Sequence, residues 1–150
     1  MISLFALGFT LVGCQMEPDV VGWWDAIEKD GMQFPIVYEG EVAQEILGDS
    51  TLQKAVQEMQ IEVNDDETGT LVSHFAMTSI DGEEYDFSYP MPMTTAISVH
   101  PYVFRAVDSD TAEEIEMSCV HTQADILNCK YTTNDPQAPE GTLSFVRPVD

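Results

Sequence analysis

Apolar and polar residues alternate along most of this chain, and turn-forming residues interrupt the alternation about every ten positions. The alternation is clearest in residues 59–63, 85–89 and 115–119, where hydrophobic side chains share one face and polar side chains the other. A period of two is typical of a β-strand with one buried face. The pattern therefore predicts an all-β, antiparallel protein whose strands share one core.

Nine segments have strand-like patterns. They are residues 20–27, 32–38, 59–63, 70–80, 85–89, 95–107, 115–119, 127–131 and 143–146. Proline modifies three of them: Pro35 limits the second to an edge or a bulge, Pro90-Met91-Pro92 ends the fifth, and Pro101 bends the sixth. Strands joined in sequence by short turns favour an up-and-down barrel of about eight to nine strands, because closure removes exposed edges.

Residues 41–58 have a different, helical spacing. Val42, Ile46 and Leu47 would form one short helix that Gly48 closes. Ser50 and Gln53 form a capping box before a second run of apolar residues at 52, 55, 56 and 59. We therefore expect one or two short helices that cover one end of the sheet.

The first residues differ from the rest because residues 1–13 are apolar and carry no charge. The run is too short to span a bilayer and is typical of a signal peptide, the alternative being a buried first strand. Leu11-Val12-Gly13-Cys14 resembles the lipobox of bacterial lipoproteins. The resemblance implies cleavage before Cys14, a lipid on its sulfur and a membrane as partner. The predicted organisation is a signal peptide at 1–13, a lipidated tether at 14–19 and a barrel domain at 20–150.

The location predicted by this resemblance is the bacterial cell envelope. Gln15, rather than Asp, follows the cysteine, which favours the outer membrane. Two acyl chains hold a protein stably at a bilayer, whereas one does so only marginally.

Composition narrows the classes of function. Of 150 residues, 27 are Asp or Glu and 5 are Lys or Arg, giving a net charge of −22. Such a surface repels phosphate backbones, so we expect no nucleic-acid partner. The chain contains no Gly-x-Ser-x-Gly, P-loop, His-Glu-x-x-His or Cys-x-x-Cys motif. We therefore expect no enzyme and no cofactor.

Metal binding has little support in the sequence. His74, His100 and His121 lie on separate predicted strands without ligand spacing, so we expect no transition-metal site. The acidic turns at 65–67 and 108–110 offer carboxylate oxygens suited to weak calcium binding. The alternative is that these turns are simply solvated.

The hydrophobic pattern also predicts how Cys119 and Cys129 are related. If the strands around them pair about a turn near Ala124, setting these two residues opposite also places Met117 opposite Tyr131 and His121 opposite Leu127. All of these positions lie on the apolar face, and a slip of one residue would reverse one strand. An envelope location favours a disulfide between the two cysteines. Two free thiols or half of a metal site are the alternatives.

Three motifs give the chain a resemblance to the lipocalin-like domains of bacterial lipoproteins. They are Gly22-Trp23-Trp24, the turn at 64–70, and the pair Cys119 and Cys129 followed by Gly141 to Arg147. The resemblance implies that a Trp plugs one end of the barrel and that Arg147 stacks on or near Trp24. It also implies a general capacity for small apolar ligands.

The candidate ligand-pocket residues are inward-facing aromatic and methionine side chains. They are Trp24, Phe75, Tyr85, Phe87, Tyr89, Phe104, Met117, Tyr131 and Phe145. Eight strands enclose just enough room for side chains, so these residues either fill the interior or leave a cup for one molecule. We accordingly expect either a lipid-anchored protein that binds a small apolar ligand or an interaction lipoprotein with a filled core and an acidic surface.

Overall fold

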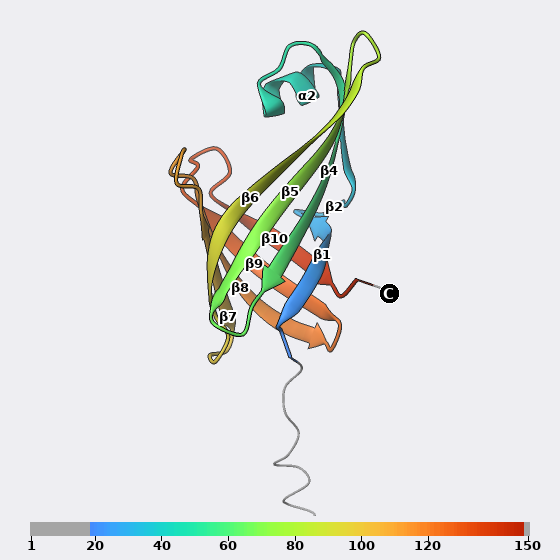
Figure 1. The fold of residues 1–150 in the computed structure, drawn as a ribbon. Helices are drawn as coiled ribbons and strands as arrows, with labels where there is room; N and C mark the ends of the chain where they lie inside the picture. Colours follow the sequence, from blue (N-terminus) through green and yellow to red (C-terminus); the bar gives the residue numbers. More distant parts are fainter. Residues whose placement is uncertain (1–18, 149–150) are drawn as a thin grey trace, which may run out of the picture.

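The computed structural model describes residues 19–148 (Figure 1). Ten strands and one helix follow each other along the chain: β1 (Gly22–Lys29), β2 (Met32–Gln33), β3 (Ile36–Glu39), α2 (Gly40–Leu47), β4 (Leu52–Val63), β5 (Thr68–Ser79), β6 (Glu84–Ala96), β7 (Tyr102–Val107), β8 (Glu114–Gln123), β9 (Ile126–Thr133) and β10 (Glu140–Val146). The predicted signal peptide at 1–13 and Cys14 lie outside the described residues. Within residues 19–148, no helix is both long enough and apolar enough to cross a membrane.

Eight of the strands close into an antiparallel barrel. The sequential ladder runs from β4 to β10, and β1 joins its two ends by pairing with β10 on one side and with β4 on the other. The closing register places Trp24 opposite Ile61 and Asp25 opposite both Gln60 and Val146. From β4 to β10, each strand pairs with its sequence neighbour through a short connection, so the predicted up-and-down barrel is confirmed.

Strands β1 and β4 separate toward one end of the barrel, and β2 and β3 occupy the edges that this leaves. β2 forms a hairpin with the end of β1, and β3 pairs with the first half of β4. The sequence predicted one strand over residues 32–38. Pro35 instead divides the segment, because proline has no N–H to donate to a ladder.

The barrel is uneven in height because β4, β5 and β6 are much longer than β7. β7 pairs with β6 over residues 93–96, whereas β5 pairs with β6 over residues 84–94. The surplus length projects beyond the barrel and carries β3 and α2 (Figure 1). We call residues 36–58 and 74–90 the arm.

Two predictions about residues 85–107 were wrong: an interruption at Pro90-Met91-Pro92 and one continuous strand over 95–107. β6 runs through Pro90 and Pro92 without a break, because β7 does not pair with this part of β6 and no ladder there requires their N–H groups. The predicted long strand at 95–107 is instead two strands, β6 and β7, separated by a turn at 97–101.

One short helix forms where one or two were expected. α2 ends at Gly48, whose φ of 64° is left-handed and whose N–H donates to the Gln44 carbonyl. The second predicted helix, beginning at Ser50, was wrong, because residues 52–63 form β4. The alternation in β4 was hidden by the inward-facing polar residue Gln57 and by a register irregularity between Leu52 and Lys54.

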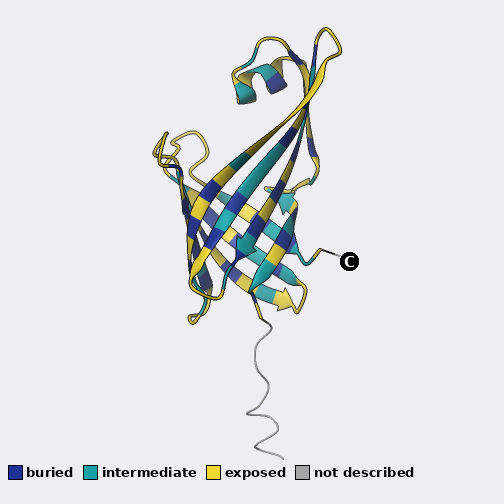
Figure 2. Cartoon of the chain, viewed as in Figure 1, coloured by how far each residue is buried: buried dark blue, intermediate teal, exposed yellow. Residues whose placement is uncertain are grey.

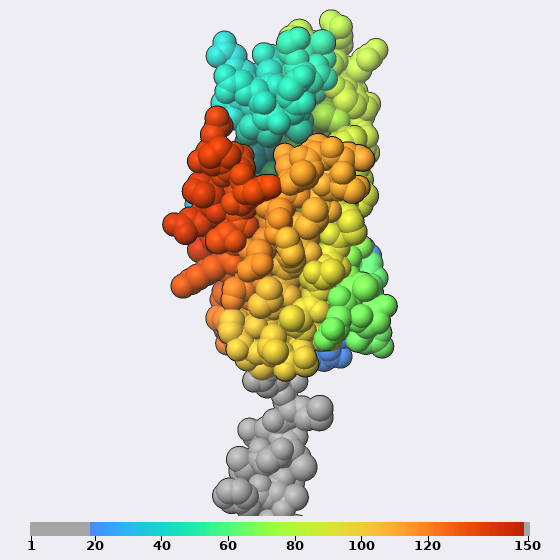
Figure 3. All heavy atoms as spheres, turned by 90° about the vertical axis from the view of Figure 1, so that its left-hand side faces the viewer, coloured from blue at the N-terminus to red at the C-terminus, as the bar shows by residue number. Residues whose placement is uncertain are grey.

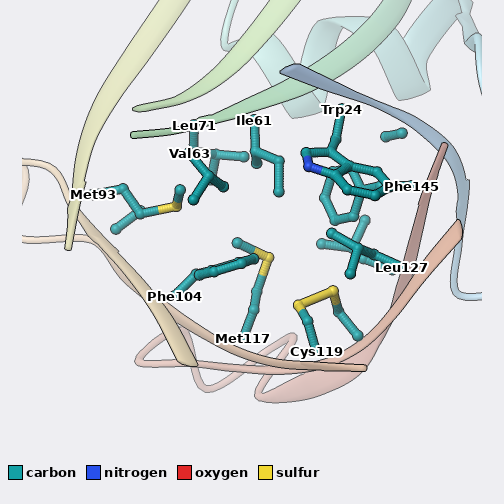
Figure 4. Packing of buried hydrophobic residues seen from close by; sticks show 14 of the residues in the cluster. Trp24, Ile61, Val63, Leu71, Met93, Phe104, Met117, Cys119, Leu127 and Phe145 are labelled. Carbon is teal, nitrogen blue, oxygen red and sulfur yellow. A yellow bond between two sulfur atoms is a disulfide. The ribbon is translucent and has the colours of Figure 1, made fainter. Parts of the chain in front are cut away.

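The barrel core is densely filled at its centre. Figure 4 shows side chains from around the wall that point to the axis. The largest fully buried side chains of the described residues include Trp24, Phe104, Phe145, Ile61, Met117, Leu127 and Leu143 in the barrel and Leu52 in the arm. Buried and exposed residues alternate along the barrel strands, as the sequence predicted (Figure 2).

The Cys119–Cys129 disulfide is confirmed, together with its register. Cys119 is opposite Cys129, Met117 is opposite Tyr131 and His121 is opposite Leu127. The turn between the two strands comprises residues 124–125. The disulfide therefore joins neighbouring strands of the wall and lies within the core.

One end of the barrel is plugged by Trp24. The indole Nε1 donates to the Val20 carbonyl at 2.8 Å, and the Arg147 guanidinium lies 4.0 Å from the centre of the indole ring. Arg147 also donates to the Val21 carbonyl at 2.7 Å. A Cβ on Gly22 would lie 2.6 Å from Arg147 Nη1, so this close approach requires glycine. The packing of Arg147 on Trp24 implied by the resemblance is confirmed.

Candidate functional site

The opposite end of the barrel contains a hollow of about 300 Å³, which we call the mouth cavity. Its apolar lining comprises Met59, Leu71, Phe75, Tyr89, Met91, Ile115, Tyr131 and Ala138, and its polar lining comprises Lys29, Gln57, Ser73, Glu113, Glu114, Thr133, Asn134 and Asp135. Strands β4, β5 and β6 supply one wall, and the strands β8 and β9 with the loops beside them supply the other. Ligand pockets of this size usually combine apolar walls with a few polar groups.

The cavity exists because the core ends below the rim. Leu71 and Met91, a pair on β5 and β6, are buried and continue the core. The next inward pair is Ser73 with Tyr89, and the small serine leaves space where the positions below carry larger side chains. Phe75 is the next inward residue of β5 after Ser73, and it also packs in the core of the arm. The cavity therefore lies between two separately packed groups of side chains.

One wall of the cavity is fixed by a hydrogen-bonded group around Tyr131. Its hydroxyl donates to Asp30 Oδ2 at 2.5 Å, and the backbone N–H of Thr142 donates to Asp30 Oδ1 at 2.8 Å. A Cβ on Gly141 would lie 2.0 Å from Asp30 Oδ1, so this group needs glycine there. Burial, with the nearby Asp30 carboxylate, raises the pKa of Tyr131 well above its ordinary value. Tyr131 is therefore a neutral hydrogen-bond donor that is held in one position.

A second polar pair lies where the cavity meets the arm. Tyr38 on β3 donates its hydroxyl hydrogen to Gln57 Oε1 at 2.9 Å. Gln57 is buried, and this bond offsets the cost of placing an amide on the inward face. Partial burial also raises the pKa of Tyr38. The pair gives the cavity a polar boundary at the base of the arm.

The rim opposite the arm is formed by the β7–β8 loop and the β9–β10 loop, which are joined by hydrogen bonds. Asn134 Oδ1 accepts the N–H of Glu114, and Asn134 Nδ2 donates to the Ala112 carbonyl at 2.8 Å. Arg105 donates to the Glu114 carboxylate at 2.5 Å, and this hydrogen bond lowers the pKa of the half-buried Glu114. Figure 3 shows the two loops facing each other below α2. The rim is thus held by specific bonds and does not depend on packing alone.

The nine predicted pocket residues lie in three places. Phe75, Tyr89 and Tyr131 line the mouth cavity. Trp24, Phe104, Met117 and Phe145 are buried in the filled core. Tyr85 and Phe87 lie on the arm. The centre of the barrel is therefore filled by side chains, whereas the end near the arm contains a hollow.

The prediction that Tyr85 and Phe87 face an enclosed interior was wrong. They share the strand face of Tyr89, Met91 and Met93, as the alternation indicated. However, Tyr85 is 40% exposed and Phe87 is 49% exposed, because this part of β6 extends beyond the opposite wall of the barrel. The side-chain direction was predictable, whereas the height relative to the rim was not.

Several lining residues were missed by sequence reasoning. Ser73 had a usable signal, since it lies between Leu71 and Phe75 on the inward face of a predicted strand. Lys29, Glu113 and Asp135 had none, because they lie at strand ends or in turns whose position depends on barrel closure. Gln57 was hidden within the segment mistaken for a helix.

In the described part of the chain, no three His, Cys, Asp or Glu side chains converge. Asp108 accepts hydrogen bonds from the Asp110 N–H and the Thr111 hydroxyl, and these lower its pKa. The side chain of Asp66 likewise binds Thr68. These two carboxylates therefore stabilise their own turns.

Among solved structures, the chain is similar to a fluorescence-activating β-barrel of de novo design. The two share 14% sequence identity, the match covers 85% of this chain and 93% of the designed chain, and the TM-score is 0.41. No protein-family model matches the chain, and no curated protein matches its sequence. Any ligand proposed for the mouth cavity must therefore be inferred from the residues that line it.

Proposed function

We propose that this protein binds one small apolar molecule in the mouth cavity and is not an enzyme. The observation that carries the proposal is a hollow of about 300 Å³ above a filled core, with Leu71, Met91 and Ile115 among its apolar lining. Burial of apolar surface contributes about 25 cal/mol per Å² to binding before ordering costs. The fixed hydroxyl of Tyr131 and the buried Gln57 amide provide polar contacts that would orient a ligand.

We further propose that the protein is a lipocalin-like lipoprotein anchored in the bacterial envelope through Cys14. The lipobox at residues 11–14 supports the anchor. The packing of Arg147 on Trp24 at the plugged end supports the lipocalin-like relationship. The outer membrane is the proposed location, because Gln15 follows the cysteine.

The alternative is an interaction lipoprotein that takes no small ligand, and the filled lower core favours it. A neutral apolar dye, N-phenyl-1-naphthylamine, separates the two when it is titrated into the purified protein. Saturable fluorescence enhancement with a Kd of about 10 µM or below supports the cavity. Absence of saturable binding would favour the alternative.

A matched pair of variants localises the binding. Ser73→Phe places a ring inside the cavity, whereas Ser88→Phe places the same ring on the exposed outer face of the neighbouring strand. We expect Ser73→Phe to weaken dye binding about tenfold, because the added ring occupies the ligand volume, and Ser88→Phe to change it less than about twofold. Equal effects would exclude the mouth cavity as the binding site.

The anchor is tested separately by Cys14→Ser. The variant should move from the membrane fraction to the soluble fraction of the cell, since the thioether to the lipid cannot form. Continued membrane association would contradict the proposed lipidation.

A further inference from the structure

The charged residues of the mouth cavity have an excess of negative charge at the rim. Four charged side chains line the cavity: Lys29, Glu113, Glu114 and Asp135. Glu114 is bonded to Arg105, so its charge is balanced locally. Glu113 and Asp135 are exposed on the two facing loops, and the whole chain carries −22. A molecule entering between these loops therefore meets a negative potential.

The single lining cation is directed at an aromatic ring. Lys29 Nζ lies 5.8 Å from the centre of the Tyr131 ring, whose hydroxyl is bonded to Asp30. Asp30 follows Lys29 in the same turn, so the two charges lie close together in the chain. Lys29 consequently offsets only part of the negative charge of the rim.

On the β5–β6 wall, the aromatic residues Phe75 and Tyr89 lie further toward the open end of the barrel than the apolar pair Leu71 and Met91. Phe75, Tyr89 and Tyr131 line the cavity, and Phe87 stacks on Tyr89 with ring centres 6.3 Å apart. The faces of aromatic rings attract cations, quaternary ammonium groups in particular. Carboxylates beside such rings strengthen that attraction and repel an anionic head group.

From this arrangement we propose that the ligand is an amphipathic cation, an alkyl amine or alkylammonium compound, rather than a fatty acid. Its apolar tail lies on Leu71 and Met91 beside the ring of Tyr131, and its ammonium group lies against the rings of Phe75 and Tyr89, facing the loops that carry Glu113 and Asp135. The inference rests on the proposed function, because it specifies the ligand of that cavity.

Three probes with one tail and different heads test the proposal: decyltrimethylammonium, decanol and decanoate, each below its micelle concentration at pH 7. Displacement of the neutral dye gives their relative affinities. We expect the ammonium compound to bind about tenfold more tightly than decanoate, with decanol between them. Added salt should reduce the difference, because exposed charges are screened.

Two double variants distinguish a local from a general effect of charge. Glu113→Gln with Asp135→Asn removes two carboxylates from the rim, whereas Asp65→Asn with Glu84→Gln removes two exposed carboxylates that do not line the cavity. The rim variant should reduce the preference for the cation to about threefold or less, and the control variant should leave it near tenfold. Equal reduction would overturn the assignment to the rim.

Tyr89→Leu tests the aromatic contribution while keeping an apolar wall. We expect the ammonium probe to lose about threefold in affinity and decanol less than about twofold. Equal losses for the two probes would overturn the cation–aromatic contact.

The proposal and its premise fail in different ways. If decanol and decanoate bind as tightly as the ammonium compound, the charge selectivity is overturned and apolar binding stands. If neither the dye nor any of the three probes binds, the cavity is not a ligand site and both proposals fall.

Discussion

The barrel and the arm are built from the same strands but are stabilised differently. In the barrel, inward side chains face an opposite wall, and those at the centre, such as Phe104 and Phe145, are fully buried. In the arm, the inner face meets only the short helix α2, whose contacts form a small core of Ala43, Leu52, Ala55, Phe75 and Met77. The comparison shows that alternation determines which face a residue occupies, whereas closure determines whether that face is buried.

The exposed residues of the two regions differ accordingly. The arm leaves Val42 and Ile46 of α2 exposed, together with Ile80 at the β5–β6 turn and Tyr85 and Phe87 on β6. Figure 2 shows exposed residues gathered at the end of the arm and alternating with buried ones on the barrel strands. The arm is therefore expected to open at a lower free energy than the barrel.

The largest difference should come from removing one large aromatic residue from each region. Phe104→Ala should lower the free energy of unfolding by about 3–5 kcal/mol, because it creates a cavity in a closed core. Phe87→Ala, a matched change on the inner face of the arm where the side chain is 49% exposed, should cost less than about 1 kcal/mol. Urea denaturation of both variants measures the contrast, and similar losses would contradict the distinction between the regions.

The disulfide should provide the next largest effect. Replacing both Cys119 and Cys129 by Ala should lower the free energy of unfolding by about 2–3 kcal/mol, because the unfolded chain loses a closed loop. The measurement is denaturation of the wild type with and without reductant, beside the double variant. A double variant as stable as the oxidised protein would show that the bond adds nothing to the pairing of β8 with β9.

Leu52→Ala tests whether the arm opens by itself. Leu52 is fully buried in the core of the arm, and its truncation should cost about 2 kcal/mol, at the lower end for leucine because α2 can relax into the space. Hydrogen exchange should accelerate in β3 and in residues 52–57 of β4. Loss of protection in β8 and β9 as well would show that the arm and barrel unfold as one unit.

The smallest effect concerns the bond between Tyr85 and Asp49. The Tyr85 hydroxyl donates to Asp49 Oδ2 at 3.0 Å and links β6 to the turn after α2. Hydrogen bonds from Thr51, then from Tyr85, hold the pKa of Asp49 below its ordinary value. A carboxyl with a lowered folded pKa stabilises the fold above its unfolded pKa, about 3.9, and loses this effect as pH falls through the folded pKa.

The expected result is therefore pH-dependent. Tyr85→Phe should increase proteolysis of the arm slightly at pH 7, and the difference from wild type should disappear at low pH. Limited proteolysis with an acid-tolerant protease across this range provides the measurement. A difference that is constant with pH would exclude the Asp49 carboxylate as the partner that matters.

Parts of the fold that depend on local pattern were predictable from the sequence. The register of Cys119 with Cys129 followed from the shared apolar face of their neighbours, and the end of α2 followed from Gly48. The segment at 52–63 was misassigned because Gln57 occupies an inward position. That position is tolerated only because Tyr38, distant in sequence, binds it.

The mouth cavity was less predictable than the barrel, because its position depends on the height at which the strands on each side of the barrel end. The aromatic type and inward direction of Phe75, Tyr89 and Tyr131 could be predicted from the sequence. The local sequence does not, however, distinguish these cavity-lining residues from Phe104 in the filled core or from Phe87 on the arm. The acidic residues Glu113 and Asp135 reach the cavity through loop positions that only the closed structure defines.

The Trp24 plug lies at the same end as both borders of the described chain. Arg147 contacts the carbonyl of Val21 through its side chain, and its N–H donates to the Asp125 carbonyl in the turn at that end. Residues 19 and 148 therefore lie at the end of the barrel opposite the mouth. A support attached directly at either of these two residues should leave the mouth open to solutes, which suits the molecule to surface-based binding measurements.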